Sequence, residues 1–134
     1  ADGVWLLGYG DTLAVFAEQR HRQRLEHTTT LWTTWVNRYP DRQGIKYVRS
    51  LMEFDCTNRL QRNVSQTYYN QRGGVIQTAG MTDTSYVVPD SLGEAAFSAA
   101  CGPLDDWFDT AVLLRSDDNE IAFADYLFAT GQAR

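Results

Sequence analysis

The sequence predicts an α+β fold: an antiparallel sheet of about six strands, a disulfide-tethered helix on one face of it, and a C-terminal helical extension. Segments of strand-like composition, joined by short turns, fill residues 4–79. Residues 91–131 contain predicted helices bounded by start and stop signals. The two cysteines, Cys56 and Cys101, close one predicted strand and one predicted helix, where a covalent link between the two would need them.

Length, composition and charge limit the class of protein. The 134 residues are 43% hydrophobic and 22% charged, which is the composition of one globular domain. The formal net charge of −5 is unevenly distributed, because residues 1–75 hold ten Lys and Arg against seven Asp and Glu, whereas residues 76–134 hold two against ten. Nucleic-acid binding requires clustered cations to contact phosphates. We therefore predict no nucleic-acid partner.

The first half of the predicted sheet begins with a hairpin. Residues 4–7 and 12–19 flank the turn Gly8-Tyr9-Gly10-Asp11, and in the second segment Leu13, Val15 and Ala17 recur with the period of two of a strand. After an arginine-rich turn, residues 26–39 are dense in Thr, Trp and Val, which favour a pleated surface, and they end at Pro40. These features predict three strands, the first two of them adjacent.

The second half of the sheet follows with short connections. Residues 45–56, 59–69 and 75–79 are predicted strands, separated by turns at Thr57-Asn58 and Gly73-Gly74. Such short connections favour antiparallel neighbours in sequence order. The period of two within the fourth strand places one apolar set on a single face, and the set ends in the cysteine: Met52, Phe54 and Cys56.

A short helix is predicted between a cap and a stop. Ser91 with Glu94 three residues later forms a capping box, and Gly102-Pro103 ends the segment immediately after Cys101. A link from Cys56 to Cys101 closes a loop of about 45 residues, which the chain-entropy model values at roughly 4 kcal/mol. We expect a structural disulfide rather than a catalytic or metal-binding pair, and therefore an oxidising, extracytoplasmic compartment.

The last thirty residues predict two further helices. Apolar residues from Trp107 to Leu114 recur at helical spacing after Asp105-Asp106, and Asp117 with Glu120 repeats a capping pattern before Ile121–Thr130. We divide the chain into a domain of residues 1–103 and an extension of residues 104–134. The extension holds more aromatic residues than one short helix needs, so either they pack on the sheet or some face a partner or a second subunit: Trp107, Phe108, Phe123, Tyr126 and Phe128.

One basic segment is a candidate for binding a polyanion. Arg20, Arg22 and Arg24 would lie on one side of an extended segment with roughly 7 Å between successive side chains. Guanidinium groups at that spacing suit sulfate, phosphate or carboxylate groups. A solvated turn is the favoured interpretation, and polyanion binding is the alternative.

Motifs that name a reaction are missing from the sequence. The cysteines are not spaced as Cys-x-x-Cys, and His21 and His27 stand beside arginines that would repel a metal ion, so we expect no metal and no cofactor. A Gly-x-Ser-x-Gly nucleophile motif does not occur. Glu53 and Asp55 share a strand face and could act as an acid–base pair, although a place on the solvent side of the sheet is the favoured interpretation.

Several spaced residues are similar to those of a known family. The chain resembles the bacterial surface-adhesin protein E-like domain over about residues 4–102, because it carries Trp32 with Tyr47, Phe54-Asp55-Cys56 followed by Arg59 and Arg62, a tyrosine pair before Gly73-Gly74, and Val88-Pro89-Asp90-Ser91 before a helix that ends in Cys101. The resemblance implies a curved antiparallel sheet with the helix tied to its concave face by the disulfide. Residues 104–134 lie beyond the family pattern.

These observations lead to three functional hypotheses. The first is a non-enzymatic, adhesin-like binding module, located in the periplasm, on the outer surface or secreted, with a protein partner from the envelope or a host. Cleavage of a signal peptide would leave a chain that begins at Ala1. The second hypothesis is a periplasmic inhibitor or immunity protein that binds a basic site through the acidic C-terminal region. The third is a small carboxylate-dependent enzyme.

Overall fold

The computed structural model of the chain describes residues 3–131, so Ala1 and the question of a cleaved signal peptide lie outside the described residues. Within those residues one sheet contains nine strands. Their bounds are β1 Val4–Tyr9, β2 Leu13–Glu18, β3 Gln23–Arg24, β4 Thr29–Asn37, β5 Tyr47–Asp55, β6 Leu60–Tyr69, β7 Val75–Ala79, β8 Ser85–Tyr86 and β9 Val112–Leu113. The helices of the same part of the chain are the 3₁₀ turn η1 Gln19–His21, α1 Leu92–Cys101, α2 Asp106–Thr110 and α3 Glu120–Thr130.

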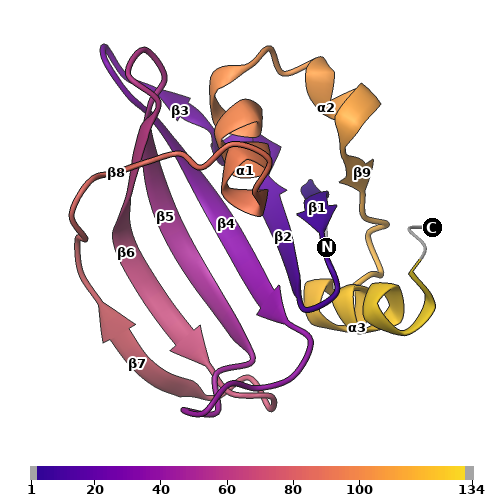
Figure 1. Ribbon diagram of the computed structural model, residues 1–134. Helices are drawn as coiled ribbons and strands as arrows, with labels where there is room; N and C mark the ends of the chain where they lie inside the picture. The colour runs from indigo at the N-terminus through magenta and orange to yellow at the C-terminus, as the bar shows by residue number, and fades with distance from the viewer. Residues whose placement is uncertain (1–2, 132–134) are drawn as a thin grey trace.

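The sheet is open and antiparallel, with its long strands in the order β7-β6-β5-β4-β2-β1-β9 (Figure 1). The six predicted strands correspond to the six long strands β1, β2, β4, β5, β6 and β7, and they pair in sequence order because their connections are short. The α+β fold class is therefore confirmed. The two-residue strands β3, β8 and β9 are additions that pair with β4, β6 and β1.

Two hydrophobic cores lie on opposite faces of this sheet. Leu31 and Val36 of β4 are an odd number of residues apart, so they point to opposite faces. Leu31 belongs to the core that contains Phe97 of α1, and Val36 belongs to the core that contains Phe123 of α3. Helix α1 therefore covers one face, and α3 covers the other.

Helix α1 is capped and tethered as the sequence predicts. The Ser91 hydroxyl accepts a hydrogen bond from the backbone N–H of Glu94 at 3.2 Å, which satisfies one of the free N–H groups of the first turn. Cys56 and Cys101 form a disulfide with 5.6 Å between their Cα atoms. Met52 and Phe54 of β5 are buried beneath the helix in its core. The predicted disulfide-tethered helix is therefore confirmed.

The C-terminal segment differs from the prediction at two points. Helix α2 ends at Thr110 rather than continuing to Leu114, because Val112–Leu113 form β9 and pair with the free edge of β1. Pairing with β9 satisfies N–H and C=O groups at the free edge of β1, and this stabilises the chain more than one further turn of helix would. The N-cap of α3 is Asn119 rather than Asp117, since the Asn119 side chain accepts from the N–H groups of Ile121 and Ala122.

The aromatic side chains of the extension divide into buried and exposed groups. Trp107 packs edge to face on Trp5 with 5.9 Å between ring centroids, in the core beneath α1. Phe123 and Phe128 are buried in the opposite core. Phe108 remains 68% exposed and Tyr126 40% exposed. The extension therefore packs on both faces of the sheet, and Phe108 is its most exposed aromatic residue among those described.

Candidate functional site

The arginine segment is not the extended array that its spacing predicts. Gln19–His21 forms a 3₁₀ turn, so Arg20 and Arg22 do not keep the pitch of a strand. Arg22 donates to the carbonyl oxygens of Ala99 and Gly102 at 3.1 and 2.5 Å, at the C-terminal end of α1. Burial, followed by the charge of Arg24, lowers the pKa of Arg22 below its ordinary value. The guanidinium group of Arg22 is thus used in hydrogen bonds to the end of α1. Polyanion contact stays a prediction for Arg20 and Arg24.

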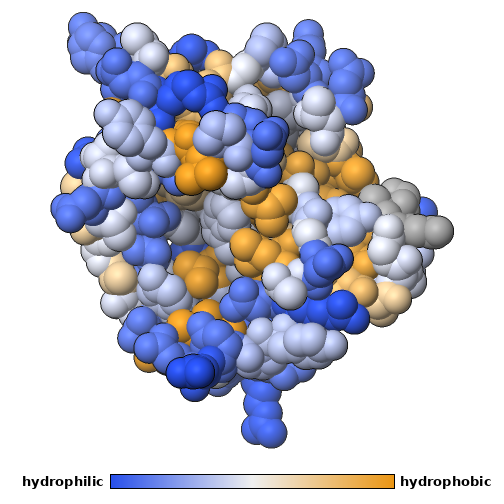
Figure 2. Space-filling view, viewed as in Figure 1, coloured by the Kyte–Doolittle hydropathy of each residue, from blue (hydrophilic) through white to orange (hydrophobic). Residues whose placement is uncertain are grey.

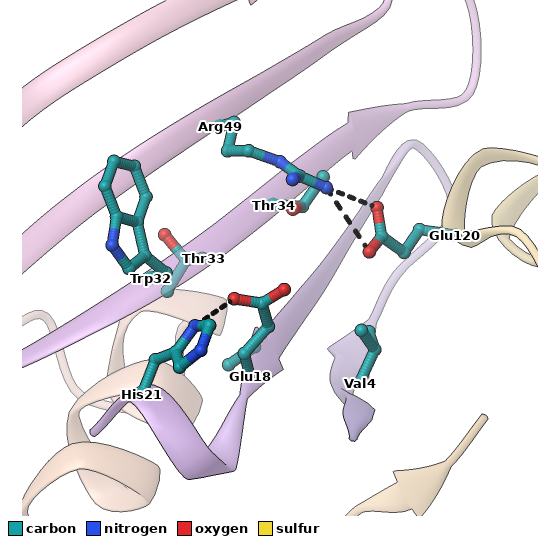
Figure 3. A pocket seen from close by; sticks show the side chains of 9 residues that line it. Val4, Glu18, His21, Trp32, Thr33, Thr34, Arg49 and Glu120 are labelled. Atoms are coloured by element: carbon teal, nitrogen blue, oxygen red, sulfur yellow. Dashed lines mark hydrogen bonds and ion pairs between the residues drawn. The ribbon is translucent and has the colours of Figure 1, made fainter. Parts of the chain in front are cut away.

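A charged pocket of about 340 Å³ lies on the α3 side of the sheet (Figure 3). Arg49 of β5 and Glu120 of α3 point toward one another, with Arg49 Nη2 3.0 Å from Glu120 Oε2. His21 Nδ1 lies 2.7 Å from Glu18 Oε2. The lining residues are Val4, Ala17, Glu18, His21, Trp32, Thr33, Thr34, Arg49 and Glu120.

The charges in this pocket are arranged as pairs. The side chain of Glu120 is 9% exposed and that of Arg49 is 42% exposed, so the guanidinium group offsets the cost of burying the carboxylate. Glu18 orients the imidazole of His21, as a carboxylate orients a general base. A nucleophile that completes such a system must lie within hydrogen-bond reach of the base. Among the described residues, the hydrogen bond of His21 goes to Glu18 and not to a hydroxyl group.

The carboxylate pair that the sequence suggested for acid–base chemistry, Glu53 and Asp55, is divided between two separate interactions. Glu53 Oε1 binds the guanidinium group of Arg62 at 2.7 Å. Asp55 accepts from Asn58 and Thr57 in the turn between β5 and β6. The Asn58 side chain is the main cause that lowers the pKa of Asp55. A general acid needs a raised pKa, so Asp55 is unsuited to that role.

A second pocket, which we call the concave pocket, lies on the α1 side of the sheet. It has a volume of about 250 Å³, and Figure 2 shows a recess over β4 and β5 on this side of the molecule. None of its lining residues carries a charge, whereas several carry amide groups or aromatic rings. They are Trp35, Val48, Ser50, Met52, Gln61, Asn63, Gln66, Tyr68 and Gly93.

A β-bulge explains why sequence reasoning missed the concave pocket. The register between β5 and β6 shifts from Leu51–Ser65 to Met52–Asn63, which leaves Val64 as the extra residue. Without the bulge, strict alternation through Val64 would turn Gln61 and Asn63 to the face opposite Gln66. The bulge thus places both amides in the pocket. A local sequence signal for it, such as a glycine at this position, does not occur.

The third surface belongs to the extension and is exposed. The Phe108 surface comprises Leu104, Asp105, Phe108, Asp109 and Leu113, all of which are exposed. Leu104 and Phe108 are four residues apart around the turns that lead into α2, so they share one side. Leu113 is the register partner of Trp5, and the ring of Phe108 packs on Trp5 at 5.3 Å. Figure 2 shows hydrophobic side chains gathered around α2 and β9.

A comparison with protein-family models identifies the family of this chain. The model of the family described as surface-adhesin protein E matches residues 5–102, well over half of the chain. The chain belongs to the surface-adhesin protein E family. Neither a curated protein nor a solved structure matches it significantly. The family match covers the sheet from β1 to β8 and helix α1, including both disulfide cysteines.

Membership of the surface-adhesin protein E family has consequences for location and role. It implies an extracytoplasmic or surface location and a binding role of the adhesin type. None of the helices within residues 3–131 is long and apolar enough to cross a membrane. The concave pocket lies within the family match. The Phe108 surface lies beyond it, in the extension.

Proposed function

We propose that this chain is a non-enzymatic, secreted or periplasmic binding module that contacts a protein partner through the Phe108 surface. The observation that carries the proposal is the exposure of Phe108. Its side chain remains 68% exposed although its neighbour Trp107 is buried in the core. An aromatic anchor held at the surface beside other apolar side chains is the usual centre of a protein–protein contact.

The support beneath Phe108 favours a binding role over a packing role. Its ring rests edge to face on Trp5, which is itself buried, so the side chain is held in place from one side only. Little conformational entropy remains to be lost when a partner covers the other side. Leu104 and Leu113 widen the apolar area around it.

Charge limits the chemistry of the partner. Asp105 and Asp109 flank Phe108, and Asp106 is exposed beside them. Residues 76–134 as a whole contain ten acidic residues against two basic ones. A partner with an apolar centre and a basic rim complements this surface and associates faster at low ionic strength. The same charge pattern supports an inhibitor or immunity protein that occupies a basic site, which is the second candidate function.

Site-specific photocrosslinking tests the proposal. A benzoyl-phenylalanine is placed at position 108, and at position 86 as the matched control, because Tyr86 of β8 is an aromatic residue that is at least as exposed as Phe108 and lies outside the Phe108 surface. Each protein is incubated with the native envelope fraction. We expect one crosslinked protein from position 108 only, with a yield that falls as salt is added. Excess unlabelled protein should abolish the crosslink, and the Phe108→Ser variant should not.

Three outcomes contradict the proposal. Equal crosslinking from positions 108 and 86 means that the contact is non-specific. A crosslink that Phe108→Ser competes away as well as the unmodified chain places the contact elsewhere. A crosslink to a second copy of this chain identifies a homodimer instead of a heterologous partner.

A further inference from the structure

The concave pocket combines features that suit one class of ligand. Its nine lining residues are uncharged, so an ionic ligand would lose its hydration without gaining a counter-charge. Trp35 and Tyr68 supply aromatic rings, and Gln61, Asn63 and Gln66 supply amides. A sugar ring has one apolar C–H face and a rim of neutral hydroxyl groups, which complements aromatic faces combined with amide groups.

One pocket atom lacks a hydrogen-bond partner. The side-chain oxygen Oε1 of Gln61 is the one buried side-chain polar atom without a partner among residues 3–131. Buried acceptors without a donor are rare in folded proteins because each costs the desolvation energy of the group. Gln61 packs beside Gly93 at the start of α1, where a Cβ would lie 3.8 Å from this oxygen. A rotation of the Gln61 amide about its terminal torsion would turn this oxygen toward the pocket, where a hydroxyl donor of a bound ligand would satisfy it.

The other two amides have their oxygens occupied and their nitrogens available. Ser50 Oγ donates to Asn63 Oδ1 at 2.7 Å, and the Tyr68 hydroxyl donates to Gln66 Oε1 at 2.8 Å. These bonds fix the orientation of each amide and direct its NH₂ group away from the bonded oxygen. The pocket therefore offers two donors and one acceptor, which is a pattern that vicinal hydroxyl groups can match.

The two rings are held in place by the sheet. Trp35, Val48 and Tyr68 occupy one cross-strand row, since Trp35 pairs with Val48 and Val48 pairs with Tyr68. Trp35 Nε1 donates to Thr33 Oγ1 at 2.9 Å, which anchors the indole. Side chains on adjacent strands of one row lie about 5 Å apart, so the rings flank the small side chain of Val48.

We propose that the concave pocket binds a neutral saccharide, with one sugar residue seated between Trp35 and Tyr68. Its apolar face packs on an aromatic ring, its hydroxyl oxygens accept from Asn63 and Gln66, and one hydroxyl donates to Gln61 Oε1. The backbone groups of β5 are used in pairing with β4 and β6, so its side chains supply its polar contacts with the ligand. An extended peptide, which binds by pairing with a strand edge, gains nothing there.

Protein NMR with defined sugars tests this site. The probes are lactose, maltotriose, cellotriose and chitotriose as neutral saccharides, with sialyllactose and a neutral tetrapeptide as comparisons. We expect at least one neutral saccharide to shift the side-chain NH₂ signals of Asn63 and Gln66. The comparisons should leave them unchanged. If none of the neutral saccharides shifts these signals, or if the peptide or the anionic sugar shifts them more strongly, the proposal is wrong.

Two substitutions connect binding to the pocket geometry. Gln61→Met should weaken saccharide binding about threefold to tenfold, because one neutral hydrogen bond is lost. It should leave the thermal midpoint unchanged or raised, since a buried unsatisfied acceptor is removed. Tyr68→Ala should weaken binding about tenfold or more. The matched control Gln43→Met changes an exposed glutamine in the turn between β4 and β5, away from the pocket, and should leave binding unaltered. Equal affinity in Gln61→Met and Gln43→Met contradicts the proposal.

Discussion

Arg22 and Trp107 donate hydrogen bonds to the same atom, the carbonyl oxygen of Ala99, at 3.1 and 3.0 Å. Ala99 lies in the last turn of α1, where carbonyl oxygens lack an intrahelical partner. One donor comes from the segment between η1 and β3 and the other from α2. Together with the disulfide at Cys101, they connect the C-terminal end of α1 to three other parts of the chain. The extension is thereby joined to the part of the chain that matches the family.

Removing the indole of Trp107 tests this junction. Trp107→Ala should lower the free energy of unfolding by about 3–5 kcal/mol, because it leaves a cavity beside Trp5 and takes one donor from Ala99. The adjacent control Phe108→Ala should cost no more than about 1.5 kcal/mol, since that side chain is mostly exposed and loses only its ring contact. Urea denaturation measures both. Similar losses for the two variants would mean that Trp107 is not part of the core.

The disulfide should contribute a similar amount by another route. Cys56 and Cys101 are 45 residues apart in sequence, and closing a loop of that length restricts the unfolded chain. The double variant Cys56→Ala/Cys101→Ala should lose roughly 4 kcal/mol of the free energy of unfolding, measured by urea denaturation. The folding and unfolding rates show how this loss divides between slower folding and faster unfolding. Addition of reductant to the unmodified chain should give the same loss, while the double variant should not respond. A loss below about 1 kcal/mol would contradict the chain-entropy account.

Some elements could be predicted from the sequence because local and tertiary preferences agree. In β5, Met52 and Phe54 alternate with Leu51 and Glu53, and one face of the strand is buried beneath α1. Any shift of register would expose the apolar set, so the pattern fixes the strand. The capping box of α1 likewise acts within four residues, and its signal is complete in the sequence.

Other elements depend on contacts that the sequence does not display. Val112–Leu113 fit a helical pattern, and they become a strand only because the edge of β1 is free to pair with them. The bulge at Val64 has no local signal, so the amides of the concave pocket could not be assigned to one face. The N-cap of α3 is a different case. Asp117 and Asn119 are both good capping residues, and the local sequence does not decide between them, so the prediction of Asp117 was wrong.

The ion pair between Lys46 and Asp125 should show an asymmetry on substitution. Lys46 Nζ donates to Asp125 Oδ1 at 2.7 Å and to the carbonyl oxygen of Arg38 at 2.8 Å, and its side chain is 2% exposed against 47% for Asp125. Asp125→Ala leaves the buried ammonium without its counter-charge and should cost about 2 kcal/mol. Lys46→Met removes the charge and keeps the apolar stem, so it should cost less than about 1 kcal/mol.

A double-mutant cycle isolates the pair itself. In the Lys46→Met background, Asp125→Ala should have almost no further effect on the urea midpoint, because the group that needed the carboxylate is absent. Equal losses for Asp125→Ala in both backgrounds would mean that Asp125 stabilises α3 independently of Lys46.

The turn between β5 and β6 should make stability depend on acid. Hydrogen bonds from the Asn58 side chain, then from the backbone of Asn58 and Thr57, lower the pKa of Asp55 in the folded chain. A carboxylate with a lowered folded pKa stabilises the fold fully above its unfolded pKa of about 3.9, and the contribution is lost as the pH falls through the folded pKa. The difference in free energy of unfolding between the unmodified chain and Asp55→Ala should therefore be constant from pH 7 to pH 5 and shrink below pH 4.

A second variant tests the cause of the lowered pKa. Asn58→Ala removes the side-chain hydrogen bond that contributes most to it, so the Asp55 carboxyl carbon should titrate at a higher pH in that variant by NMR. An unchanged titration would mean that the backbone bonds alone hold the carboxylate ionised.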